Sequence, residues 1–150
     1  FGIEIDEETR KTLKKNIISN SLTKRIKIIT FDDFKSLKIK SKNKNFSKIL
    51  VLIDIEGNEY NLLNKTNIKY FKNDFLIIEL HQFISNSSTK HNKFIQLLKK
   101  YYKIEEIKNG SRNPYLKEIE HLSDEERWMI VSEGRPCEMS WLICSPKIIV

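Results

Sequence analysis

Short apolar runs alternate along the chain with stretches whose apolar residues recur every three or four positions. The apolar runs are dominated by Ile, a β-branched residue that suits a pleated sheet. They predict strands at residues 1–5, 25–30, 50–54, 75–80, 103–107 and 140–144. The amphipathic stretches predict helices at about 6–20, 58–64 and 90–102, with a helical turn near 123–128.

Strand and helix alternate through most of this order, which favours an α/β fold with a mostly parallel sheet. The last two predicted strands have no clear helix between them, so we expect an antiparallel pair at one edge. The chain has 150 residues, enough for one domain with a core and not for two. We therefore predict a single domain over residues 1–150, built as a Rossmann-like three-layer αβα sandwich.

The segment 50–59 carries the strongest candidate chemistry. Its apolar run leads directly into Asp54, Glu56 and Gly57, and a helical pattern follows. Ligands of open α/β sheets bind just past the carboxyl ends of parallel strands, where these acids lie. The alternative interpretation is that both carboxylates are only solvated at the end of a strand.

Composition narrows the classes of partner. A hydrophobic fraction of 39% with 31% charged residues is typical of a globular protein. The net charge of +7 comes from lysines spread along the whole chain, and no basic patch with interleaved aromatic residues is present. We therefore expect no nucleic-acid partner. The lysine-rich segment 35–48 is predicted to be a solvated surface loop.

The remaining chemistry-bearing residues are few. Cys137 and Cys144 are the only cysteines, and no histidine or second cysteine stands at metal-ligand spacing. From these residues we predict reduced thiols, a cytoplasmic protein and no metal site. We expect no membrane partner, because no apolar run approaches about 20 residues.

Four segments, taken in order, resemble a known family. They are GIEID at 2–6, LKKNIISN at 13–20, LIDIEGNE at 52–59 and IIELH at 77–81. This series is similar to the carboxyl-terminal two-thirds of FkbM-type, class I S-adenosylmethionine-dependent methyltransferases, over about residues 1–100. The element Asp-x-Glu-Gly-x-Glu is fairly specific, and the other three carry weight only in this order.

The resemblance implies a role for each matching acid. Glu4 would accept hydrogen bonds from both ribose hydroxyls of S-adenosylmethionine, and Asp32 or Asp33 would lie near the adenine amine. Asp54 would flank the methionine part of the cofactor. For Asp33, a helix cap is the competing interpretation.

The same resemblance implies the catalytic and substrate groups. Asp54, Glu56 and His81 would be catalytic, orienting the acceptor or taking its proton, and Glu79 would line the substrate site. A purely structural role for His81 is the alternative interpretation.

Arg135, in the Gly- and Pro-containing segment 132–136, is predicted to bind a carboxylate or phosphate of the substrate, the alternative being a plain turn.

The family holds its cofactor with a glycine-rich turn after a first, central strand. The four glycines of this chain lie too far apart to form such a turn. We therefore expect a truncated domain that lacks the first strand of the methyltransferase fold, incomplete or inactive as a fragment, and a homodimer is an open possibility.

The expected function is methyl transfer to an oxygen or nitrogen of a small molecule or sugar. The alternative is a non-catalytic Rossmann-like binding or assembly module. Asn113-Pro114-Tyr115 is similar to a loop of methyltransferases that act on nucleic-acid amines, but it stands after the wrong strand. We interpret it as a turn.

Overall fold

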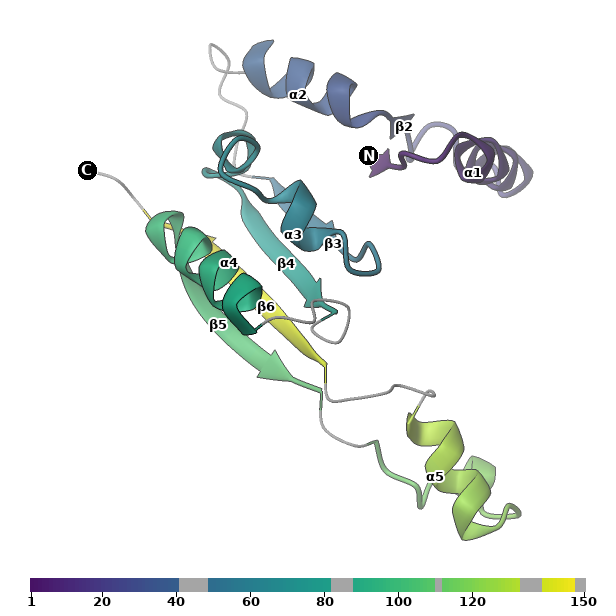
Figure 1. Ribbon diagram of the computed structural model, residues 1–150. Helices are drawn as coiled ribbons and strands as arrows, with labels where there is room; N and C mark the ends of the chain where they lie inside the picture. The colour runs from purple at the N-terminus through teal and green to yellow at the C-terminus, as the bar shows by residue number, and fades with distance from the viewer. Residues whose placement is uncertain (41–48, 82–87, 110–111, 133–138, 148–150) are drawn as a thin grey trace. The chain divides into compact units, whose positions relative to one another are not determined.

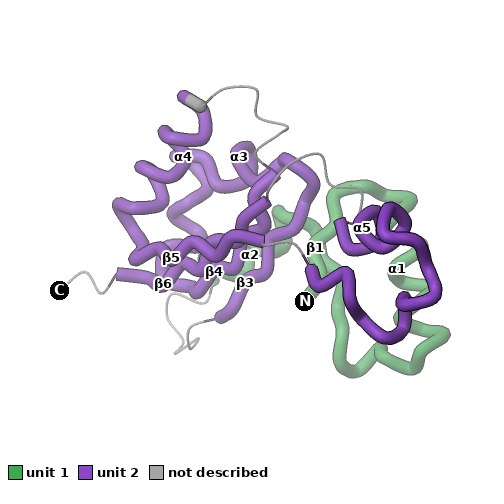
Figure 2. The backbone as a smooth tube through the Cα atoms, turned by 90° about the horizontal axis from the view of Figure 1, so that it is seen from below, with its two compact units in different colours: residues 1–47 green, residues 48–150 purple. Residues whose placement is uncertain are grey.

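The computed structural model describes residues 1–40, 49–81, 88–109, 112–132 and 139–147. The chain divides into two compact units, unit 1 at Phe1–Ser47 and unit 2 at Lys48–Val150 (Figure 2). Each unit is described by itself below. The single-domain prediction stays a prediction.

Unit 1 pairs two short strands with two helices. Strand β1 (Gly2–Ile3) runs parallel to β2 (Ile28–Ile29), and helix α1 (Glu7–Ser19) connects them. The Asp6 side chain accepts a hydrogen bond from the Thr9 backbone N–H at 2.7 Å and so caps α1. The predicted helix and the parallel pairing are confirmed, although both strands are shorter than the apolar runs suggested.

Helix α2 (Phe31–Lys40) contradicts part of the prediction for the lysine-rich segment. Residues 35–40 are helical rather than a loop, and residues 41–48 lie outside the described residues. The helix forms because Thr30 and Asp33 make a capping box at its start, and because Phe31 and Phe34 stack one turn apart. Acids in its first turn and lysines in its last turn suit the helix dipole.

Unit 2 contains a four-stranded sheet in the order β3-β4-β6-β5 (Figure 1). The strands are β3 (Leu50–Ile53), β4 (Phe75–Leu80), β5 (Tyr102–Lys108) and β6 (Ser140–Pro146). Strands β3 and β4 are parallel, whereas β6 is antiparallel to both β4 and β5. The predicted antiparallel pair, β5 and β6, is therefore present. In the sheet β6 lies between β4 and β5, and β5 is the edge strand. A mixed α/β fold is confirmed.

One face of this sheet forms the core of unit 2. Leu76, Ile78 and Leu80 of β4 and Leu142 of β6 are at most 1% exposed. Helices α3 (Glu59–Leu62) and α4 (Ser88–Tyr101) lie over the same face in both backbone views (Figures 1 and 2). The rings of Tyr60 and Phe94 join these two helices at 4.7 Å between centroids.

Within the described residues of unit 2, the leucines on the opposite face of β3 are largely exposed. Leu50 and Leu52 are 65% and 64% exposed, whereas Ile53, on the core face, is 3% exposed. The three-layer arrangement and the missing first, central strand stay predictions.

Unit 2 also contains two short 3₁₀ helices that the hydrophobic pattern did not predict. They are η2 (Ile68–Tyr70) and η3 (Lys117–Ile119). The Tyr102 hydroxyl donates a hydrogen bond to the carbonyl oxygen of Phe71, just after η2, at 2.6 Å. Burial raises the pKa of this phenol, so the hydroxyl keeps its proton and the bond persists.

Cys144 of β6 is fully buried, and burial raises the pKa of its thiol to about 12. A thiol reacts as its thiolate, so Cys144 should be inert in the folded protein. In a Cys137→Ser variant, we expect no reaction with 5,5′-dithiobis(2-nitrobenzoate) at about pH 8 under native conditions. One thiol should react after unfolding in guanidinium chloride, and rapid labelling of the folded variant would contradict the described packing of β6.

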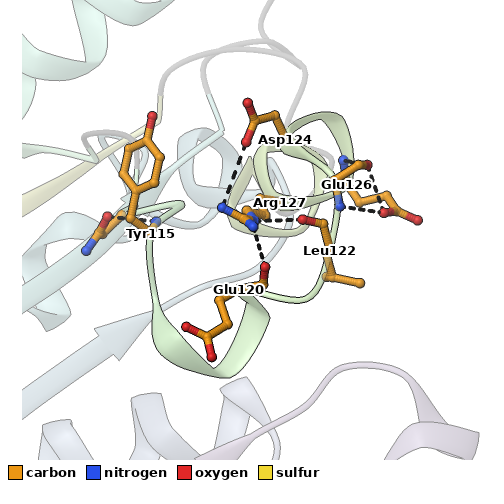
Figure 3. A network of polar contacts seen from close by, with 8 residues as sticks. Tyr115, Glu120, Leu122, Asp124, Glu126 and Arg127 are labelled. Atoms are coloured by element: carbon orange, nitrogen blue, oxygen red, sulfur yellow. Dashed lines mark hydrogen bonds and ion pairs between the residues drawn. The ribbon is translucent and has the colours of Figure 1, made fainter.

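Helix α5 (Asp124–Ser132) extends the predicted helical turn. Figure 3 shows the polar contacts that organise its start: Arg127 ion-pairs with Asp124 and donates to the carbonyl oxygens of Glu120 and Leu122. In the same region the Tyr115 backbone N–H donates to the Asn113 side chain at 2.9 Å. This local bond is typical of an Asx turn, so the interpretation of Asn113-Pro114-Tyr115 as a turn is confirmed.

Candidate functional site

The candidate site lies where β3 and β4 end. These strands are parallel neighbours, with Ile53 beside Ile78, so their carboxyl ends meet at the same edge of the sheet. Asp54 follows β3 directly, and His81 follows β4 directly. This is the edge at which open α/β sheets bind ligands. The structure therefore brings together three residues that the sequence predicted to be catalytic.

His81 stands between carboxylates on two sides. Its Nε2 lies 3.2 Å from Glu56 Oε2 and 3.9 Å from Asp54 Oδ1. Its Nδ1 lies 2.7 Å from Glu59 Oε1. The imidazole is only 3% exposed, whereas the side chains of Asp54 and Glu56 are 47% and 83% exposed. The two acids therefore face solvent, and the histidine lies behind them.

Glu59 is the member of this site that sequence reasoning missed. Glu59 is the first residue of helix α3, and its side chain is 0% exposed. Its Oε1 also accepts a hydrogen bond from the Gly57 backbone N–H at 3.0 Å. A buried carboxylate needs such partners, because a charge without them is strongly penalised. The signal was present in the sequence: Glu59 follows Glu56 by three residues, in the first turn after the acidic strand end.

A tight turn aims these side chains. Glu56 has φ of 50° and Gly57 has φ of 92°, so two successive residues adopt left-handed backbone conformations. Glycine accepts this conformation readily, whereas it is uncommon for a glutamate. The Asn58 backbone N–H closes the turn on the carbonyl oxygen of Ile55 at 3.1 Å. The turn reverses the chain so that Glu56 and Glu59 reach opposite nitrogens of His81.

The carboxylate of Glu59 determines the tautomer of His81. A carboxylate accepts hydrogen bonds only, so Nδ1 must carry a proton and donate it to Glu59. In the neutral imidazole, Nε2 then presents a lone pair toward Asp54 and Glu56. The second nitrogen of this buried histidine is oriented toward two exposed acids, and its catalytic role stays a prediction.

The predicted cofactor residues Glu4 and Asp32 belong to unit 1. Glu4 follows β1, and its Oε1 accepts from the Asp6 backbone N–H at 2.8 Å. Asp32 lies in the first turn of α2, largely exposed, and forms an ion pair with Lys35. Asp33 accepts from the Thr30 backbone N–H and hydroxyl, which holds the pKa of its carboxyl below the usual range. The alternative role of Asp33 as a helix cap is confirmed.

The two predicted substrate residues differ in what the structure shows of them. Glu79 lies on β4, two residues before His81, and is 6% exposed. Arg135 lies outside the described residues. The roles of both residues stay predictions.

Acidic groups and a histidine at the ends of neighbouring parallel strands define an α/β protein with a candidate ligand site at the sheet edge. Comparison with protein-family models identifies the family of this chain. The model of the methyltransferase FkbM domain matches residues 3–104, so the chain belongs to this family. No curated protein and no solved structure matches the chain. Within the described residues, no helix has the length and apolar character needed to cross a membrane.

Proposed function

We propose that the protein transfers a methyl group from S-adenosylmethionine to an oxygen or nitrogen of a small molecule or sugar. The observation that carries this proposal is the arrangement of Glu56, His81 and Glu59 at the edge where β3 and β4 end. Membership of the FkbM methyltransferase family supports methyl transfer as the general chemistry. The cytoplasm is the proposed place of action, as the two predicted reduced thiols suggest.

The residues of the chain suit such a cofactor. Glu4, at the end of a parallel strand, has one oxygen engaged by Asp6, and within the described residues the other oxygen accepts nothing. A carboxylate oxygen of this kind accepts readily from ribose hydroxyls. We propose that Glu4 and Asp32 hold the nucleoside and Asp54 the methionine part. When bound, S-adenosylmethionine supplies a methyl carbon on a positively charged sulfur, which departs as the neutral thioether S-adenosylhomocysteine.

The exposed acids would handle the acceptor. We propose Glu56 as the proton acceptor, because its side chain is the more exposed of the two carboxylates and so the more accessible to an acceptor molecule. The acceptor O–H or N–H would give its proton to Glu56 as the new bond to carbon forms. His81, held by Glu59, is proposed to position the groups of this site, and Asp54 would orient the acceptor. Glu79 and Arg135 are proposed to bind other parts of the substrate.

Binding of S-adenosylhomocysteine tests this proposal. The natural full-length protein that contains this sequence should bind it in a calorimetric titration, in buffer with EDTA. A Glu4→Gln variant should bind at least about 10-fold more weakly, because an amide cannot accept from both ribose hydroxyls as a carboxylate does. Glu8→Gln, an exposed acid on the same unit that pairs with Lys11, is the control and should bind normally.

Failure of the full-length protein to bind S-adenosylhomocysteine would overturn the methyltransferase proposal and favour the non-catalytic binding module. Unchanged affinity in Glu4→Gln would remove Glu4 from the cofactor site.

A further inference from the structure

We propose that Asp54, Glu56 and His81 bind one divalent transition-metal cation, with Mn²⁺ as the representative ion. Residue spacing in the sequence predicted no metal site, because metal sites are usually recognised there by clustered cysteines and histidines. The structure instead assembles one histidine and two acids from the ends of two different strands. The proposed cation belongs to the same edge of the sheet as the methyl-transfer chemistry.

The distances suit a shared ion. One ligand atom from each of the three residues lies within 4.8 Å of the others, and His81 Nε2 is 3.2 and 3.9 Å from the two carboxylate oxygens. Ligand atoms that bind one ion at about 2.1 Å lie about 3 to 4.2 Å apart. The Nε2 distances already fall in this range, so small side-chain rotations of the exposed acids would complete the coordination.

The buried side of His81 gives independent support. A metal-bound histidine almost always donates its other ring N–H to a carboxylate or carbonyl, which fixes the ring and its tautomer. His81 donates its Nδ1–H to Glu59 Oε1 in this way at 2.7 Å, and both side chains are nearly or fully buried. In the tautomer that donates to Glu59, His81 Nε2 faces Glu56 Oε2 at 3.2 Å, so a cation bound to both atoms would lie on the side of the ring away from Glu59.

The charges also favour a cation. Asp54, Glu56 and Glu59 bring three carboxylates around a single imidazole. Within the described part of the chain, no lysine or arginine pairs with any of these three acids. A divalent ion supplies the missing positive charge where the acids converge.

The donor set selects the kind of ion. Two carboxylate oxygens and one imidazole nitrogen suit Mn²⁺, Fe²⁺ or Zn²⁺ better than Ca²⁺, which takes oxygen ligands. Three protein ligands leave coordination positions open. If the proposed function holds, these positions would bind the acceptor oxygen or nitrogen and make its proton easier to remove, and the second carboxylate oxygen of Glu56 would take that proton.

Mn²⁺ binding can be measured without any cofactor. The natural full-length protein, stripped of metal with EDTA and desalted, is titrated with Mn²⁺ while electron paramagnetic resonance records the free ion. One ion per chain should bind, and excess Ca²⁺ should displace it poorly. Asp54→Asn and Glu56→Gln should each weaken binding at least about 10-fold. Both side chains are exposed and both substitutions keep their shape, so the fold is preserved.

Glu125→Gln is the matched control, an exposed acid in the first turn of α5, and it should bind Mn²⁺ as the unsubstituted protein does. Absence of Mn²⁺ binding, or equal binding by both site variants, would overturn the metal site. The proposed function fails separately, through loss of S-adenosylhomocysteine binding in EDTA, so the two failures are distinguishable.

Discussion

A Glu56→Gln substitution is expected to lower the turnover number of methyl transfer by about 10²- to 10⁴-fold, the usual contribution of a general base. The amide keeps the shape of the side chain but cannot take a proton from the acceptor. Because Glu56 is 83% exposed, the substitution should leave the fold intact. Affinity for S-adenosylhomocysteine should change less than about 3-fold, since Glu56 is not assigned to the cofactor.

The measurement follows tritiated methyl transfer from S-adenosylmethionine to a panel of methyl glycosides and primary amines. Rates are compared on the best acceptor of the unsubstituted protein, at Mn²⁺ concentrations that saturate both proteins. Glu125→Gln serves again as the control acid and should transfer normally. Turnover by Glu56→Gln within about 3-fold of the control would refute its role as proton acceptor.

His81 should respond differently, because it is proposed to hold the cation that binds the acceptor and not to take the proton. A His81→Asn variant should lower turnover and raise KM for the acceptor together. His121→Asn, on the exposed surface before α5, is the control histidine.

The elements that the sequence predicted well have strong local signals. The run that forms β4 is apolar throughout and appears in the structure with the predicted bounds, Phe75–Leu80. Helix α1 begins where Asp6 caps it, as the acids at its start suggested. Local propensity and capping act within a few residues, so a sequence reveals them directly.

The error at residues 35–40 shows how a charge pattern misleads. The six lysines of segment 35–48, with no acid among them, indicated a loop. Helix α2 is instead started by residues before this segment, through the Thr30–Asp33 capping box and the Phe31–Phe34 pair. Lysine is itself a good helix former, so the helix continues into the basic segment once it has started.

The site illustrates what spacing cannot provide. Asp54 and Glu56 were recognisable at a strand end, but the pairing of His81 with Glu59 spans 22 residues and depends on β3 and β4 being parallel neighbours. Glu59 was visible only as part of a motif. Its burial, which gives it a role, comes from the turn at Glu56 and Gly57 and from the packing of α3.

The packing that supports His81 gives the second large effect. Leu80 directly precedes His81, is 0% exposed and lies on the core face of β4. A Leu80→Ala variant should lose about 2 to 5 kcal/mol of unfolding free energy, because the removed atoms leave a cavity beneath α3 and α4. Leu52→Ala is the matched control on the neighbouring strand, and its side chain is 64% exposed. It should lose less than about 1 kcal/mol.

Urea unfolding followed by circular dichroism measures both variants, and the midpoints should shift while the slopes stay equal. The two leucines occupy opposite faces of one sheet, so their difference reports which face is covered. A loss for Leu52→Ala as large as that for Leu80→Ala would overturn this assignment of faces. It would also mean that apolar side chains cover the second face, as the predicted three-layer sandwich requires.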